Sequence, residues 1–176
     1  MDFGQVLSDG LRAAIGIPAV AYALAAIGLN IHFGYTGLLN FGHVAFMLVG
    51  AYGTAIGATE FGLPLPLAVL IGVAGAVLLA LLLGLPTLRL RAEYLAIVTI
   101  SVAEILRIAV RSQSFEEVTG GPSGIGEWAG AFYDINPIPA GRYGIGSIAF
   151  NESELWVLAF GWTLIVLEIL LVRLLV

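Results

Sequence analysis

The chain has 176 residues, of which 60% are hydrophobic and only 11% are charged, and its formal net charge is −5. Soluble domains carry roughly 25% charged residues, so this composition indicates that most of the chain is solvated by lipid. The sequence contains no cysteine, no lysine and no basic run, which excludes disulfides, thiolate-bound metals and a lysine-containing P-loop and makes binding of nucleic acid improbable.

The first apolar run, residues 11–29, predicts a spanning helix that contains Pro18, which a membrane helix tolerates as a kink. Residues 30–42 are apolar in part but are broken repeatedly by glycine and polar residues. A uniform lipid-facing helix would not carry this pattern, so an interrupted segment is predicted after the first span.

Further apolar runs follow, each close to the roughly 20 residues that cross the hydrocarbon core. They occupy residues 43–59, 63–84, 92–110 and 154–176. We therefore expect an all-α, multi-pass transmembrane helical bundle with about five spans. Residues 1–176 should form a single membrane domain.

The orientation is predicted from Arg89 and Arg91, which lie in a short connection between two spans. Short loops rich in arginine stay cytoplasmic. Alternation then places the N-terminus outside and the C-terminus in the cytoplasm. It makes residues 111–153, which are rich in glycine and proline, an irregular extracytoplasmic loop.

The run at residues 92–110 carries a polar stripe, because a helical rotation of about 100° per residue brings its charged residues to one face. The stripe consists of Glu93, Glu104, Arg107 and Arg111. Glu104 and Arg107 are spaced to form an i, i+3 ion pair. The stripe either fixes helix packing through this pair or lines a solute or gating path.

The interrupted segment is the second candidate site, because irregular backbone at membrane depth occurs where it is buried in protein or lines a cavity. Its candidate path residues are Asn30, Gly34, Thr36, Gly37, Asn40, Gly42 and His43. The alternative is an ordinary turn between two helices. His32 and His43 have no nearby carboxylate cluster, so packing is favoured over a metal site.

Two glycines, Gly53 and Gly57, form a small-x-x-x-small face that would let another helix approach closely. The sequence shows no Ser/His/Asp set and no glycine motif that cradles phosphate. We therefore expect neither enzymatic activity nor a cofactor.

Three stretches resemble one family. Residues 34–46 read Gly-Tyr-Thr-Gly-Leu-Leu-Asn-Phe-Gly-His-Val-Ala-Phe, residues 88–100 read Leu-Arg-Leu-Arg-Ala-Glu-Tyr-Leu-Ala-Ile-Val-Thr-Ile, and residues 119–125 read Thr-Gly-Gly-Pro-Ser-Gly-Ile. Taken in this order, they are similar to signatures of the permeases of branched-chain amino-acid ABC importers, in particular the LivM-type subunits.

The resemblance implies a permease of a bacterial inner membrane that lets branched-chain amino acids, or a related solute such as urea or a short amide, cross the bilayer. It implies four partners: a second permease subunit, two cytoplasmic ATPases that hydrolyse ATP, and an extracytoplasmic solute-binding protein. By carry-over, residues 34–43 would border the translocation path, and the outer loop motif would include Thr119, Gly120, Gly121 and Gly124.

Members of this family continue past the equivalent of Val176 into a cytoplasmic coupling loop and further spans, so the resemblance covers an amino-terminal portion. The chain could accordingly be a truncated, inactive fragment. A non-transporting assembly or scaffold protein is the alternative from another class. A channel or secondary carrier is a third, but it would be expected to show stronger repeat symmetry.

Overall fold

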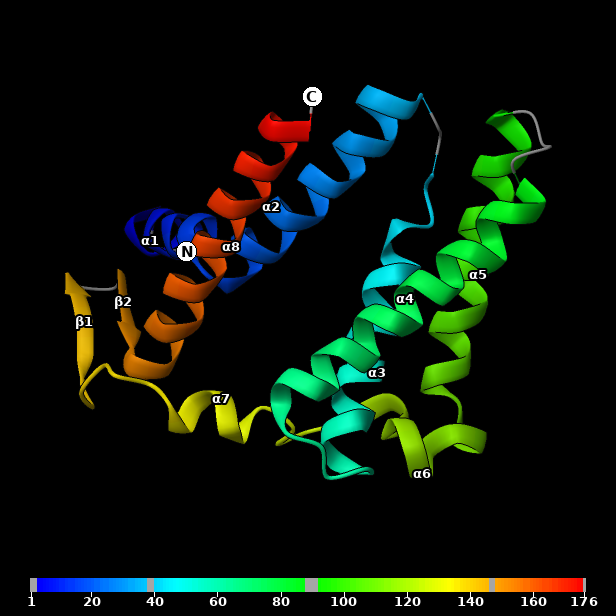
Figure 1. The fold of residues 1–176 in the computed structure, drawn as a ribbon. Helices are drawn as coiled ribbons and strands as arrows, with labels where there is room; N and C mark the ends of the chain where they lie inside the picture. The colour runs from blue at the N-terminus through cyan, green and yellow to red at the C-terminus, as the bar shows by residue number, and fades with distance from the viewer. Residues whose placement is uncertain (1–2, 38–39, 88–91, 146–147, 176) are drawn as a thin grey trace. The chain divides into compact units, whose positions relative to one another are not determined.

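The structure is a computed structural model that describes residues 3–37, 40–87, 92–145 and 148–175 (Figure 1). The contacts divide the chain into two compact units, Met1–Asn30 with Tyr133–Val176, and Ile31–Phe132. Arg89 and Arg91, on which the predicted orientation rests, lie outside the described residues.

The first unit contains an amphipathic helix, two long apolar helices and a small hairpin. Its elements are α1 (Phe3–Ile15), α2 (Ile17–Asn30), β1 (Arg142–Ile145), β2 (Ile148–Asn151) and α8 (Glu152–Leu175). The short helix α7 (Gly130–Asp134) lies where the chain returns to this unit.

The prediction of one spanning helix over residues 11–29 is wrong at its start, because residues 11–15 belong to α1 and the helix breaks at Gly16. Gly16 is buried, and a Cβ there would lie 2.7 Å from the carbonyl oxygen of Arg12. Pro18 therefore does not kink a span. It lies in the first turn of α2, where a missing N–H costs no helical hydrogen bond.

The two long helices of this unit pack together along their length and run in the same direction (Figure 1). Their core consists of Val20, Phe150, Leu158 and Ile165. Gly161 is buried directly against Val20, which allows close approach of the two backbones. The hairpin β1–β2 is antiparallel, with Arg142 opposite Asn151, and it leads into the first residue of α8.

The second unit is built on three helices, α3 (His43–Thr59), α4 (Leu65–Thr87) and α5 (Ala92–Arg111). A π-helical turn, η1 (Ile31–Thr36), precedes them. Three short helical turns follow them, η2 (Gln113–Phe115), α6 (Glu116–Thr119) and η3 (Gly121–Ser123). Among these helices α3 is central, since it packs on both α4 and α5.

The small face predicted on α3 is confirmed, because it forms the close contact with α4. A Cβ at Gly53 would lie 3.0 Å from the Cα of Gly72, and a Cβ at Gly57 would lie 3.3 Å from the Cα of Ala68. Hydroxyl and backbone groups of Thr54 fill the remaining space beside Gly72. Small residues on both helices thus bring the two backbones together.

The predicted all-α membrane class is confirmed. Within the described ranges, three helical stretches are long and apolar enough to cross a bilayer: Ile17–Thr36, Leu65–Leu85 and Glu152–Leu174. The other two predicted spans are also helical, but α3 has only 17 residues and α5 carries four charges. The hairpin and the short turns after α5 show that the 111–153 segment is more ordered than the sequence predicts.

Candidate functional site

The helical backbone is interrupted after the first span, as predicted, but the break begins after Thr36 and not at Asn30, because residues 31–36 form the π-helical turn η1. One buried polar side chain organises the break. Asn40 is only 6% exposed. Its side-chain carbonyl accepts a hydrogen bond from the backbone N–H of Gly42 at 3.0 Å, and its amide nitrogen lies 3.4 Å from Nδ1 of His32. This asparagine therefore links η1 to the start of α3.

The start of α3 is pressed against the middle of α5. A Cβ at Gly42 would lie 2.8 Å from both the carbonyl carbon and the Cβ of Thr99, closer than ordinary packing of carbon atoms allows. Thr99 is only 3% exposed, and its hydroxyl donates to the carbonyl oxygen of Ala96 at 3.0 Å. Only glycine fits at position 42 without a shift of one backbone.

Two histidines complete the group. The rings of His32 and His43 meet edge to face, with their centroids 5.9 Å apart and their planes at 71°. Nδ1 of His43 is buried and has no hydrogen-bond partner among the described residues. His32, Asn40, Gly42, His43 and Thr99 are called the Asn40 cluster below.

The structure brings only part of the predicted path set into this cluster. Asn40, Gly42 and His43 belong to it, whereas Asn30, Gly34, Thr36 and Gly37 are exposed. The Thr36 hydroxyl donates to the carbonyl oxygen of His32 at 2.7 Å and so closes the last turn of η1. Gly37 follows with φ of 66°, a left-handed conformation that suits glycine and ends the helix.

The predicted polar stripe lies on α5, and its two central residues form an ion pair. Nε of Arg107 donates to Glu104 Oε2 at 2.8 Å, and a second guanidinium nitrogen donates to Oε1 at 2.6 Å. Their side chains are 50% and 52% exposed, so no other described element covers the pair.

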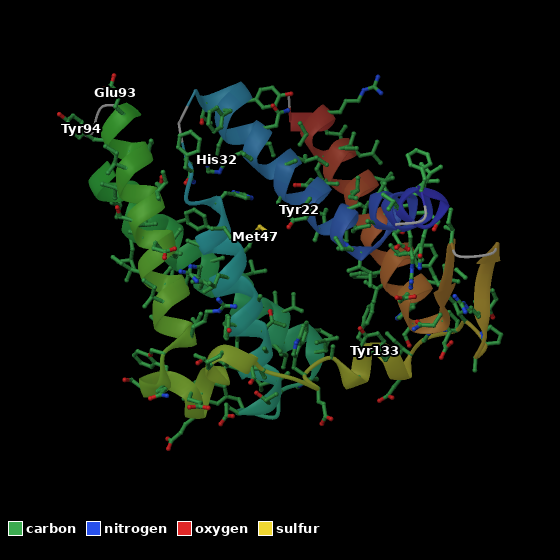
Figure 2. All side chains as sticks on the ribbon, turned by 180° about the vertical axis from the view of Figure 1, so that it is seen from behind. Tyr22, His32, Met47, Glu93, Tyr94 and Tyr133 are labelled. Atoms are coloured by element: carbon green, nitrogen blue, oxygen red, sulfur yellow. The ribbon has the colours of Figure 1, made fainter. Side chains whose placement is uncertain are left out.

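The remaining two stripe residues lie at the ends of α5. Figure 2 shows Glu93 beside Tyr94 at the amino-terminal end. Arg111 is the last residue of the helix. Both are exposed, and the acidic start and basic finish have the signs that the helix dipole favours. The stripe therefore runs along an open face of α5.

The predicted outer-loop motif forms a tight turn at the carboxyl end of α5. Thr119 is buried, and its hydroxyl lies 2.7 Å from the carbonyl oxygen of Val110 and 2.8 Å from that of Phe115. Three glycines of the motif have positive φ, 70° at Gly120, 54° at Gly121 and 70° at Gly124. Residues 119–124 thus fasten the following segment to α5 and are called the 119–124 turn.

Sequence reasoning missed two polar residues within apolar helices. Thr99 belongs to the Asn40 cluster only through a contact distant in sequence. Glu168 lies in the apolar stretch of α8, where its Oε2 is buried without a hydrogen-bond partner among the described residues. A lone carboxylate in a spanning run is costly in lipid, and this signal was present in the sequence.

Comparison with known proteins identifies a family. The family described as "Branched-chain amino acid transport system / permease component" matches residues 13–175. The matched range includes the Asn40 cluster, the α5 stripe and the 119–124 turn.

Two curated relatives are both described as "High-affinity branched-chain amino acid transport system permease protein LivM". The protein from Salmonella typhimurium is 41% identical over 117 residues, which cover 64% of this chain and 26% of the relative. The protein from Escherichia coli is 42% identical over 110 residues, covering 60% of this chain and 24% of the relative.

The chain thus matches about a quarter of the length of these curated relatives. No solved structure gives a significant match. The family match extends over almost the whole chain. This chain therefore belongs to the family of permease components of branched-chain amino acid transport systems.

Proposed function

We propose that residues 1–176 form one membrane permease domain of an ABC importer for branched-chain amino acids, in which the Asn40 cluster borders the translocation path. The observation that carries this proposal is the break between η1 and α3, held by the buried side chain of Asn40. Broken helices inside membrane proteins supply backbone amides and carbonyls to a polar solute.

The chemistry of the break suits an amino acid. The amino-terminal end of α3, at His43, carries the positive end of the helix dipole, which favours a carboxylate. The buried Nδ1 of His43 has an unused hydrogen-bonding capacity among the described residues. Nearby apolar side chains such as Phe33 and Phe41, whose rings are 5.7 Å apart, suit an aliphatic solute.

The proposal includes partners. Because the chain has no lysine, it cannot supply a P-loop, and two cytoplasmic ATPase subunits would hydrolyse ATP. A second permease subunit would form the other wall of the path, and an extracytoplasmic protein would deliver the solute. The N-terminus would lie outside a bacterial inner membrane and the C-terminus in the cytoplasm.

A chimera tests this function. Residues of this chain replace the matching 110-residue segment of the Escherichia coli relative, and the chimera is expressed in a strain that lacks that relative. Uptake of radiolabelled leucine should recover well above the strain without permease. Thr99→Val in the chimera should lower uptake, whereas Ser101→Ala should not.

These two variants are matched. Both hydroxyls lie on α5 and donate to carbonyl oxygens of their own helix, but Thr99 faces Gly42 and Ser101 is exposed. Uptake of urea or acetamide in place of leucine would assign a different solute to the same path. A chimera that inserts and assembles but moves none of these solutes would favour the scaffold alternative.

A further inference from the structure

Helix α1 has two chemically distinct faces. Its large apolar side chains recur at helical spacing and are between 47% and 80% exposed: Phe3, Val6, Leu7, Leu11 and Ile15. The opposite face carries Gln5, Ser8, Asp9 and Arg12. With 13 residues the helix is about 20 Å long, too short to cross the roughly 30 Å hydrocarbon core.

The polar face is fastened to the start of α8. One guanidinium nitrogen of Arg12 donates to both carboxylate oxygens of Glu154, at 3.0 Å to Oε1 and at 3.2 Å to Oε2. The guanidinium also lies 5.5 Å from the ring centroid of Phe150, on β2. This combination of an ion pair and a cation–π contact fixes which side of α1 is turned toward the hairpin.

Glu154 has a second role that makes this contact firm. Its Oε2 accepts a hydrogen bond from the N–H of Asn151 at 3.0 Å, while its own N–H donates to the Asn151 side chain at 2.7 Å. This reciprocal arrangement is a capping box at the first turn of α8. The carboxylate that holds α1 is therefore itself held in place.

These contacts determine the direction of the apolar face. The hairpin and the first turn of α8 mark the aqueous end of that span, because they carry Arg142, Asn151 and Glu152. A pocket of about 350 Å³ beside the polar side of α1 contains the charged residues Asp9, Arg12 and Glu154, together with non-polar residues such as Pro18 and Phe150. The apolar side chains lie on the opposite side of the helix and are exposed.

We propose that α1 lies in the plane of the membrane, with Phe3, Val6, Leu7 and Leu11 among the lipid acyl chains and the Arg12–Glu154 pair at the headgroup level. Figure 1 shows α1 crossing the direction of α2 and α8 near the end where the hairpin lies. Interfacial helices have this combination of a large apolar face and a short length.

Lipid is the occupant that the surroundings favour. Helix α1 leads directly into α2, which belongs to a membrane-spanning stretch and exposes large apolar side chains such as Tyr22. Arg12, the one basic residue of α1, is already paired with Glu154. The attachment should therefore depend on apolar burial and not on anionic lipids.

Single cysteines test the depth of α1, since the chain has no native cysteine. The whole chain carrying Leu7→Cys or Leu11→Cys is spin-labelled and reconstituted in phosphatidylcholine vesicles, with Gln5→Cys as the matched control on the polar face. Collision rates with oxygen, which partitions into lipid, are compared with those of a water-soluble nickel chelate.

The expected result is a several-fold higher ratio of oxygen to nickel collisions at positions 7 and 11 than at position 5. Adding an equal amount of phosphatidylglycerol should not change it. Equal ratios at all three positions would place α1 in water, and low collision rates with both reagents at positions 7 and 11 would mean that protein covers this face. Either outcome overturns the proposal.

A second variant tests how α1 is held. Glu154→Gln retains an acceptor for the Asn151 N–H but removes the charge that pairs with Arg12. The label at position 7 should become more mobile, while α8 keeps its helical start. The proposal rests on the membrane-embedded character of the chain and is independent of the transported solute.

Discussion

Gly42 and Thr99 lie so close that the backbone of one touches the side chain and backbone of the other, since a Cβ at Gly42 would lie 2.8 Å from the Thr99 carbonyl carbon. This contact joins the interrupted segment to α5. It combines an asparagine-stabilised turn with a buried hydroxyl on the neighbouring helix. The residues on the two sides of the polar break are therefore held by a hydrogen bond and by a close contact with α5.

Gly42→Ala should destabilise the packing of α3 on α5. The added methyl group overlaps backbone atoms of Thr99, which cannot move aside as a flexible side chain can. Overpacking of this kind costs about 1–3 kcal/mol or more. A lower thermal unfolding temperature in detergent is expected. Gly126→Ala is the control, since a Cβ there meets nothing within 4 Å, and equal stability of both variants would contradict the close contact.

Asn40→Ala should be more damaging than Asn40→Asp. Alanine leaves the Gly42 N–H without its acceptor in a buried site, at a cost of about 1–3 kcal/mol. Aspartate keeps an acceptor toward Gly42 but loses the amide that faces His32. Folding yield and leucine uptake of the chimera should follow the order asparagine, aspartate, alanine. If the Asn40→Ala variant matched the wild type in folding yield and in leucine uptake, Asn40 would have no role in holding the break.

Exchanging the charges of Glu104 and Arg107 should restore the permease assembly that the removal of one charge impairs. Glu104 and Arg107 form a bidentate pair on an open helix face. If another subunit covers that face, Glu104→Ala leaves an unpaired arginine away from water, whereas Glu104→Arg with Arg107→Glu retains a pair. Assembled permease should fall in the single variant and recover in the exchange, as measured by size-exclusion chromatography.

If the Glu104→Ala variant assembles normally, the stripe faces water in the assembled permease. Exposed pairs contribute only about 0–1 kcal/mol. Normal assembly together with altered uptake would then favour a role of the stripe in the solute path. Unchanged assembly together with unchanged uptake would contradict both the packing role and the solute-path role of the stripe.

Glu168→Leu should increase insertion of α8 into the membrane. Ionisable side chains within a span are costly, up to about 2.5–3.5 kcal/mol on insertion scales at the centre, and Oε2 of Glu168 has no compensating partner among the described residues. A glycosylation reporter measures the inserted fraction. Thr163→Leu, in the same apolar stretch, should change it much less. Equal inserted fractions for the wild-type chain and the Glu168→Leu variant would show that the carboxylate already reaches water.

Local patterns in the sequence were sufficient to predict most of the helices. Apolar run lengths located them, and the glycine and polar residues after residue 29 predicted an interruption, although the helical backbone continues to Thr36 before it breaks. The i, i+3 spacing of Glu104 and Arg107 predicted the ion pair that the structure contains. Gly53 and Gly57 indicated the contact that α4 makes through Gly72 and Ala68. Each of these features depends on residues close together in the chain.

Features that depend on distant contacts could not be predicted in this way. Thr99 differs little from Ser101 in sequence context, and only its contact with Gly42 distinguishes it. The break at Gly16 was obscured because an apolar run continues across it. The glycines and prolines around the hairpin predict an irregular segment before α8, whereas the antiparallel pairing of Arg142 with Asn151 orders it.

The most direct test of a translocation path at the break is the accessibility of Thr36 to water and to solute. Thr36→Cys and Thr163→Cys are matched, since both threonine hydroxyls donate to a carbonyl oxygen four residues earlier. In the leucine-transporting chimera, freed of other cysteines, a water-soluble thiol reagent should modify position 36 and leave position 163, in an apolar span, unmodified. Leucine should slow the reaction at position 36. An unreactive position 36, or a reaction rate that leucine does not change, would contradict the assignment of a path beside the Asn40 cluster.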